Sequence, residues 1–85
     1  MQIVRTNKFK KQYQKLTTKL QTKFDERLLL WLEDPTDSRL RVHSLTGKYV
    51  GYFSMNVMGD ICALYRHEGD EIVIFALIGS HSELY

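Results

Sequence analysis

The sequence has little of the chemistry that stabilises exported or membrane proteins. Its 85 residues include a single cysteine, Cys62, so no disulfide can form within the chain. Cys62 lies in the apolar stretch ICALY, which is typical of a small buried hydrophobe in a reducing compartment. No apolar run approaches the roughly 18 residues that a membrane span needs, and no apolar segment follows the lysine-rich N-terminal region. We therefore expect a cytoplasmic protein with no membrane association.

The chain is also too short for more than one hydrophobic core. A domain of this size buries roughly two thirds of the surface that its unfolded chain exposes, which is enough to fold but leaves no room for long insertions. No internal repeat or low-complexity segment interrupts it. Residues 1–85 are therefore predicted to form a single domain.

The net charge of +2 is modest, but the charges are unevenly distributed. Residues 1–27 hold eight Lys and Arg against two acidic residues, whereas residues 28–85 hold four against eight. A basic region attracts polyanions such as nucleic acid or the ribosome, although an ordinary solvated helix face has the same composition. The lysines that fall on one face at helical spacing, and are candidate partner contacts, are Lys8, Lys11, Lys15 and Lys19.

The N-terminal part of the chain is predicted to be a short strand followed by helices. Gln2 to Arg5 has strand character, and Thr6 or Asn7 can cap the helix that follows. A second helical segment ends before Pro35, which disfavours helix at Asp34. The segment LTTKL between them favours a helical hairpin, but it contains no Gly or Pro, so one continuous helix is the alternative. The apolar residues at helical spacing, expected in the core, are Phe9, Tyr13, Leu16, Leu20, Phe24, Leu28, Trp31 and Leu32.

The C-terminal half is predicted to consist of strands after a loop. Three strand-like runs cover Tyr49–Val57, Ile61–Arg66 and Glu71–Ile78. Gly59 and Gly69 lie in the short segments between them and supply the positive φ of tight hairpin turns. The expected fold class is α+β, with the N-terminal strand and two helices packed on an antiparallel β-meander.

Counting along the hairpins brings the C-terminal tail to one end of this sheet. With the last turn centred on Gly69, Asp60 lies opposite Ile78, and His81 follows three residues later. The preceding turn places Asn56 opposite Asp60. His81 and Asp60 could form an acid/base pair, although a structural hydrogen bond between a histidine and a carboxylate is the more common arrangement. The polar residues expected to converge are Ser54, Asn56, Asp60 and His81.

Three segments resemble a known family of proteins. They are H-x-L-x-G-x-Y-x-G at His43–Gly51, GD…LY at Gly59–Tyr65 and the terminal GSHSELY. They resemble the RelE/ParE superfamily of toxins from bacterial type II toxin–antitoxin modules, and within it the YafQ-like branch. The resemblance implies a small RelE-like fold and an endoribonuclease that cleaves mRNA on the ribosome by acid/base attack of the RNA 2′-hydroxyl. It implies a cognate antitoxin as partner, higher-order complexes on operator DNA, and no metal or other cofactor.

The resemblance also implies roles for individual residues. His43, His81 and Asp60 match catalytic positions of that branch. His81 would act as general acid or stabilise charge, and either His43 or Asp60 would be the base. The residues that the resemblance and their positions suggest for RNA binding are Tyr85, Asn56, Ser54 and Lys48, with Tyr85 stacking on a base or positioning the phosphate. Lys8, Lys11, Lys15 and Lys19 would then contact the antitoxin.

The sequence departs from the family pattern at three positions. Phe53, Ser54 and Asn56 stand where the branch typically has an arginine, an aspartate and a third histidine. Each proton-transfer group contributes roughly 10² to 10⁴ in rate, so we expect an attenuated enzyme. Two rivals stay open. One is a catalytically degenerate or ParE-like protein that binds antitoxin or gyrase without chemistry, and the other is a generic nucleic-acid-binding domain that uses the lysines.

Overall fold

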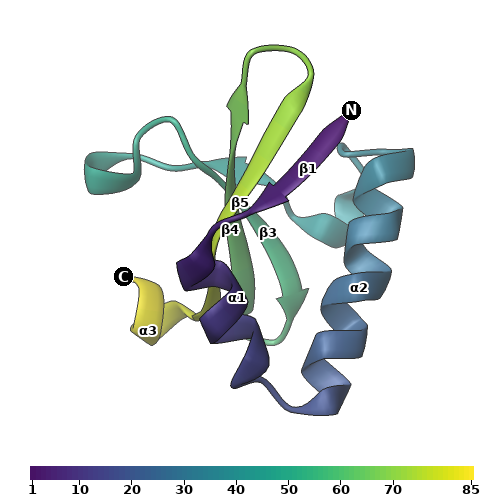
Figure 1. Ribbon diagram of the computed structural model, residues 1–85, viewed down its shortest axis with the longest axis vertical. Helices are drawn as coiled ribbons and strands as arrows, with labels where there is room; N and C mark the ends of the chain where they lie inside the picture. The colour runs from purple at the N-terminus through teal and green to yellow at the C-terminus, as the bar shows by residue number, and fades with distance from the viewer.

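Figure 1 shows the computed structural model, which describes all residues 1–85 as helices packed on a five-stranded sheet. The strands are β1 (Gln2–Arg5), β2 (His43–Ser44), β3 (Phe53–Met58), β4 (Ile61–Glu68) and β5 (Ile72–Ser80). The helices are α1 (Asn7–Gln14), α2 (Thr18–Glu33) and α3 (His81–Leu84), with the short 3-10 helices η1 (Ser38–Leu40) and η2 (Gly47–Tyr49). The strand order is β1-β5-β4-β3-β2. Strands β3, β4 and β5 form the predicted antiparallel meander, and β1 joins β5 in parallel, which confirms the α+β class with a mixed sheet.

The helical hairpin is confirmed over the single continuous helix. The Thr6 hydroxyl accepts a hydrogen bond from the Phe9 amide at 3.0 Å and begins α1. The Thr17 hydroxyl accepts from the Leu20 amide at 3.3 Å and begins α2. Each cap satisfies an amide that has no partner within its own helix, so two threonines mark boundaries where no glycine or proline does. None of the helices is long and apolar enough to cross a membrane.

The main core lies between the two long helices and the sheet. Its largest aromatic side chains are Phe9, Phe24, Trp31, Tyr65 and Phe75. Phe24 and Phe75 pack edge to face, with ring centroids 5.7 Å apart, and the Trp31 indole donates to the Tyr65 hydroxyl at 3.1 Å. Leu32 was expected in this core, but 47% of it is exposed. Trp31 occupies the inward position of that helical turn, and the next residue is rotated about 100° around the axis.

Two predicted element boundaries are wrong around the third strand and the loop before it. The strand expected from Tyr49 begins only at Phe53, because residues 47–49 form η2 and Gly51 has a φ of 92° that ends the extended backbone. The segment expected to be a loop contains η1 and the two-residue strand β2, which pairs with β3. This pairing carries His43 to the position beside Ser54.

The predicted pairing of Asp60 with Ile78 is also wrong, and the reason decides where the tail goes. The last turn is centred on Asp70 and not on Gly69, so Glu68 pairs with Ile72. Further along, Tyr65 pairs with Phe75 but Leu64 pairs with Leu77, which leaves one extra residue in β5. These two shifts bring His81, in place of Ile78, opposite Asp60, and the His81 amide donates to the Asp60 carbonyl at 3.0 Å.

This β-bulge in β5 changes which face of the sheet the end of the strand presents. Before the bulge, Val73 and Phe75 point into the main core, and beyond it Ile78 does. Leu77 instead packs against the small cluster on the other face. Because side chains alternate along a strand, the extra residue places the odd-numbered positions that lead to His81 on the face away from α1 and α2.

Candidate active site

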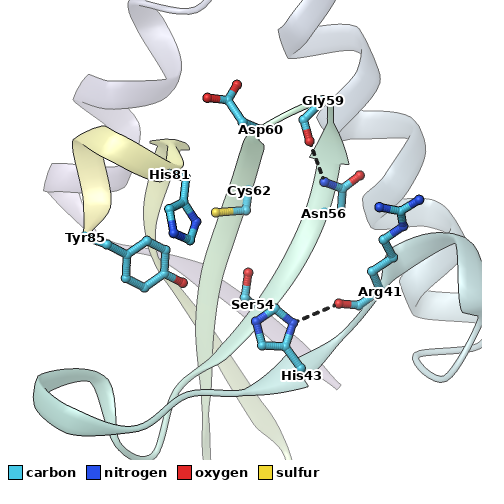
Figure 2. A pocket seen from close by; sticks show the side chains of 9 residues that line it. All are labelled: Arg41, His43, Ser54, Asn56, Gly59, Asp60, Cys62, His81 and Tyr85. Atoms are coloured by element: carbon cyan, nitrogen blue, oxygen red, sulfur yellow. Dashed lines mark hydrogen bonds between the residues drawn. The ribbon is translucent and has the colours of Figure 1, made fainter.

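The face of the sheet opposite α1 and α2 holds a hollow of about 370 Å³. Figure 2 shows its lining residues, which are Arg41, His43, Ser54, Asn56, Gly59, Asp60, Cys62, His81 and Tyr85. Six of these were predicted site residues from three distant parts of the sequence. Asn56 was expected opposite Asp60 but pairs with Cys62, because the turn consists of Gly59 and Asp60, with Met58 opposite Ile61. A one-residue register shift in β3 lies between Asn56 and Met58, and Asn56 still lines the hollow with Ser54, so the predicted convergence occurs with a different register.

His43 is held by its neighbour Arg41. The His43 Nδ1 atom lies 3.1 Å from the Arg41 carbonyl oxygen, which can only accept a hydrogen bond (Figure 2). Nδ1 therefore carries a hydrogen, and in the neutral imidazole the lone pair lies on Nε2. Arg41 ends η1 in the left-handed conformation, with φ of 48°, which costs a residue other than glycine about 1–2 kcal/mol. The chain bears this cost where a carbonyl fixes the tautomer of a site histidine.

His81 is fixed by a complete helix cap. The Ser80 hydroxyl accepts from the Glu83 amide at 3.2 Å, and the Glu83 carboxylate accepts from the Ser80 amide at 2.8 Å. Hydrogen bonding from the Ser80 amide, and from the Ser80 side chain, to the Glu83 carboxylate holds the pKa of Glu83 below its usual value. The His81 ring lies over the Tyr85 ring with centroids 4.4 Å apart. The tail is therefore an ordered turn of helix that presents both rings to the hollow.

A small second core anchors this tail to the sheet. Leu84 is only 4% exposed and packs with Cys62 and Leu64. The Tyr49 hydroxyl donates to the Leu84 carbonyl at 2.7 Å, and its ring meets the Tyr85 ring edge to face at 5.6 Å. Burial raises the pKa of the Tyr85 phenol, so it is protonated at neutral pH and able to donate a hydrogen bond. Sequence reasoning missed this anchor, although the apolar Leu84 inside a polar tail is a signal that could have found it.

Asp60 contributes through its backbone more than through its side chain. Its carbonyl receives the His81 amide, whereas Figure 2 shows its carboxylate turned away from His43 and Tyr85. Asn56 is also partly engaged, because its Nδ2 atom donates to the Gly59 carbonyl at 3.0 Å across the turn. The free imidazole nitrogens of the two histidines are therefore the groups best placed to exchange protons within the hollow.

Two predicted features lie elsewhere. Lys48 does not line the hollow, and its ammonium group lies 5.1 Å from the centre of the Tyr49 ring. Phe53 points into the main core, where it stacks on Tyr65 with centroids 5.6 Å apart. Neighbouring residues of a strand face opposite sides of the sheet, so the side chain at position 53 is separated from the hollow by the sheet itself.

Three lining residues were not among the predicted site residues, and two of them, Arg41 and Cys62, bring side-chain functional groups. Arg41 brings a guanidinium group, and no sequence motif marked it because its backbone conformation is visible only in the fold. Cys62 brings a thiol whose pKa is raised by burial, so it is a neutral group and not a thiolate nucleophile. No group of His, Cys, Asp and Glu side chains is arranged to hold a metal ion.

The four candidate partner lysines are all exposed, but they do not form one helical face. Lys8 and Lys11 lie on α1, Lys15 is the residue at which α1 ends, and Lys19 lies on α2. The expectation of a single face is wrong because the chain changes direction between the helices.

Comparison with solved structures identifies the fold. Similar structures are YafQ from E. coli strain BL21(DE3) (TM-score 0.83, 20% identity, 98% of this chain and 96% of that chain) and the E. coli DinJ-YafQ toxin-antitoxin complex (0.79, 22%, 98% and 94%). The RelBE2 toxin-antitoxin complex from Mycobacterium tuberculosis is also similar (0.75, 18%, 94% and 96%). These matches confirm the predicted RelE-like fold. Among curated proteins, no sequence gives a significant match. The model of the family described as "Bacterial toxin of type II toxin-antitoxin system, YafQ" matches residues 1–85, and the chain therefore belongs to this family of bacterial toxins.

Proposed function

We propose that this toxin is an endoribonuclease that cleaves mRNA on the ribosome through the RNA's own 2′-hydroxyl. The observation that carries the proposal is the pair of histidines in one hollow. His43 has a free Nε2 lone pair because Arg41 engages its Nδ1, and His81 faces the same space from the capped tail. Such a pair can supply both the base and the acid that this reaction requires.

The reaction moves two protons and exchanges one bond. His43 Nε2 takes the proton of the 2′-hydroxyl, whose oxygen attacks the adjacent phosphorus. The bond from phosphorus to the 5′-oxygen of the next nucleotide breaks, and His81 as imidazolium protonates that leaving oxygen. The products are a 2′,3′-cyclic phosphate and a 5′-hydroxyl end. His43 is favoured over Asp60 as the base because the Asp60 carboxylate is turned away from the ring of His43 (Figure 2).

Other residues of the hollow bind and neutralise the substrate in this proposal. No hydrogen bond or ion pair engages the Arg41 guanidinium, which is therefore free to bind a phosphate of the RNA strand. Tyr85 is 44% exposed and offers its ring to a base and its hydroxyl to a phosphate. Ser54 and Asn56 supply further polar groups, and Asn56 in place of a histidine makes the enzyme attenuated.

The test uses the three histidines of the chain. His67 lies exposed on β4 and does not line the hollow, so His67→Gln is a matched control for His43→Gln and His81→Gln. Expression of the wild-type toxin should slow growth and produce cuts within translated regions that end in a 2′,3′-cyclic phosphate. Both hollow variants should lose the cuts, and the His67 variant should keep them. A harmless wild-type protein that leaves ribosome-bound mRNA intact would replace the enzyme with a non-enzymatic binder.

The proposed partner is a cognate antitoxin encoded beside the toxin in a cytoplasmic module. The similar DinJ-YafQ and RelBE2 structures are toxin–antitoxin complexes, and this similarity motivates the proposal. Four exposed lysines around the helical hairpin favour an acidic segment of the partner. Changing Lys8, Lys11, Lys15 and Lys19 to Gln should weaken the association and flatten its salt dependence. An unchanged affinity and salt slope would mark these lysines as ordinary surface.

A further inference from the structure

A second hollow of about 450 Å³ lies beside the first and has no apolar lining. Its lining residues are Arg27, Ser38, Arg39, Arg41, Asn56 and Gly59. Arg41, Asn56 and Gly59 line both hollows, so the two are neighbours that share one wall. Figure 2 shows the Arg41 guanidinium on the side of Asn56 and away from the His43 ring. We call this second site the arginine hollow.

The arginine hollow is rich in positive charge that the protein neutralises only in part. Arg27 donates through Nε to the Val57 carbonyl at 3.3 Å, which leaves its terminal nitrogens free. Arg39 donates through Nε and Nη2 to the Asp37 carboxylate at 3.0 and 2.9 Å. Arg41 has no partner for its guanidinium. Arg39 is thus paired with Asp37 and lies near Glu33, whereas Arg27 and Arg41 have no ion pair, and no acidic residue lines the hollow itself.

We propose that the arginine hollow binds the RNA backbone phosphate adjacent to the one held between the histidines. The identity of the ligand as RNA rests on the proposed function. Guanidinium groups match phosphate oxygens with paired hydrogen bonds, and the Ser38 hydroxyl adds a further donor. The shared wall favours RNA over an acidic peptide, because a strand that crosses the first hollow carries a phosphate at every nucleotide and must continue past Arg41.

The arginine hollow would therefore set the register of the strand. A phosphate held there fixes which neighbouring 2′-hydroxyl reaches His43, and it does so without contacting the reacting atoms. Arg27 and Arg39 are binding residues in this inference, and they perform no proton transfer.

The experiment measures binding of small uncleavable ligands by NMR of the 10.0 kDa protein. The ligands are 2′-O-methyl dinucleotides with no terminal phosphate, with a 5′-phosphate, or with a 3′-phosphate, because the methyl group removes the attacking hydroxyl. One of the two phosphorylated ligands should bind wild-type protein about five- to tenfold more tightly than the unphosphorylated one, as expected for a new charge-assisted contact. Its binding should shift the Nε–H signals of the arginines.

The variants distinguish a specific phosphate-binding site from nonspecific attraction to a positively charged surface. In Arg27→Gln/Arg39→Gln the gain from the terminal phosphate should vanish, while affinity for the unphosphorylated dinucleotide is retained. Arg66→Gln is the matched control, because Arg66 lies on β4, lines neither hollow and should leave the gain intact. The single variant Arg39→Gln removes a side chain that is 65% exposed and bonded only to Asp37, so it tests the same point if Arg27 proves necessary for folding.

Three results would overturn the inference. They are no binding of any dinucleotide, no gain from either terminal phosphate, and an equal gain in wild type and the arginine double variant. A glutamate-rich peptide that shifts the arginine signals when no dinucleotide does would make the hollow a protein-binding site. None of these outcomes bears on histidine-dependent mRNA cleavage, which is measured separately and whose loss would remove the proposed function instead.

Discussion

The two faces of the sheet differ in the side chains that they bury. The face under α1 and α2 buries a cluster of eleven residues dominated by aromatic rings, including Phe24, Trp31 and Phe75. The other face buries a cluster of only three, Cys62, Leu64 and Leu84, and leaves the rest open as the candidate active site. We call the face under α1 and α2 the thick face and the other the thin face. The thick face supplies most of the hydrophobic stabilisation, so the thin face is free to hold polar groups that contribute little to folding.

The same strands serve both faces, which is why the site can be rigid without being buried. Along β3, Met55 and Val57 are fully buried in the main core, while Ser54 and Asn56 alternate with them and line the hollow. Side chains carried on packed strands are held more precisely than side chains on loops. The comparison predicts that substitutions on the thick face act through the free energy of unfolding, and those on the thin face through activity.

The largest effect is expected for Phe24→Ala on the thick face. Phe24 is fully buried and its ring contacts the rings of Phe9, Tyr13 and Phe75. Removing it should cost about 3–5 kcal/mol and lower the unfolding midpoint by on the order of 15–30 °C. His43→Ala, an exposed residue of the thin face, is the control and should change stability by less than about 0.5 kcal/mol. Equal shifts of the unfolding midpoint in the two variants would contradict the assignment of stability to the thick face and activity to the thin face.

The fold was largely predictable because its signals are local. Helix caps, hairpin glycines and apolar periodicity each act within a few residues, and they located the strand, the two helices and the meander. The register was not predictable, because the bulge in β5 and the position of the turn before it depend on how Phe75 and Ile78 both reach the main core. Counting from Gly69 therefore gave the wrong partner for Asp60. The predicted polar residues still converge, because the register errors only move the pairing along the strands.

The site was predictable only in its polar members. His43, Asp60 and His81 could be found by type and motif, whereas Arg41 enters the hollow through a left-handed backbone that no pattern marks. Lys48 was placed in the site by sequence proximity to His43, but it lies five positions further along, in η2, and does not line the hollow. Long-range geometry, such as the Tyr49 bond to the tail, is set by the completed fold.

The second largest effect is expected for Leu84→Ala, which removes a buried side chain from the small cluster of the thin face. The loss should be about 2–3 kcal/mol, near the low end for a buried leucine because the site is close to the chain end. Cleavage activity should fall by more than the loss of folded protein alone explains, because α3 carries His81 and Tyr85 into the hollow. Hydrogen exchange of the α3 amides and cleavage assays measure the two effects. Leu29→Ala, at a residue 66% exposed, should be neutral in both assays.

A third and smaller effect is expected for Asn56→His on the thin face. An added imidazole in the hollow should raise the cleavage rate about 10²-fold, at the low end of what a proton-transfer group provides. The change also removes the Asn56 bond to the Gly59 carbonyl and should cost about 1 kcal/mol of stability. Asn56→Ala is the control, with the same stability loss and no gain in rate. If both variants cleave at the wild-type rate, a missing histidine does not limit this enzyme.

The smallest effect is expected at Asp37, at the rim of the arginine hollow and outside both cores. Hydrogen bonds from the Arg39 side chain and backbone amide hold the Asp37 pKa at about 2, below its model-peptide value of 3.8. A depressed pKa in the folded state means that the carboxylate stabilises the fold above about pH 4 and loses that contribution as the pH falls toward 2. Asp37→Asn should therefore lower the unfolding midpoint by about one or two degrees at pH 7, because the pair is exposed, and the two curves should converge on acidification. Asp70→Asn, in the β4–β5 turn, should follow the wild-type curve throughout. A difference that persists unchanged at pH 2 would show that the ionised pair is not its source.

The same Asp37 variant should bind the phosphorylated dinucleotide slightly more tightly, since Arg39 no longer shares its donors with a carboxylate.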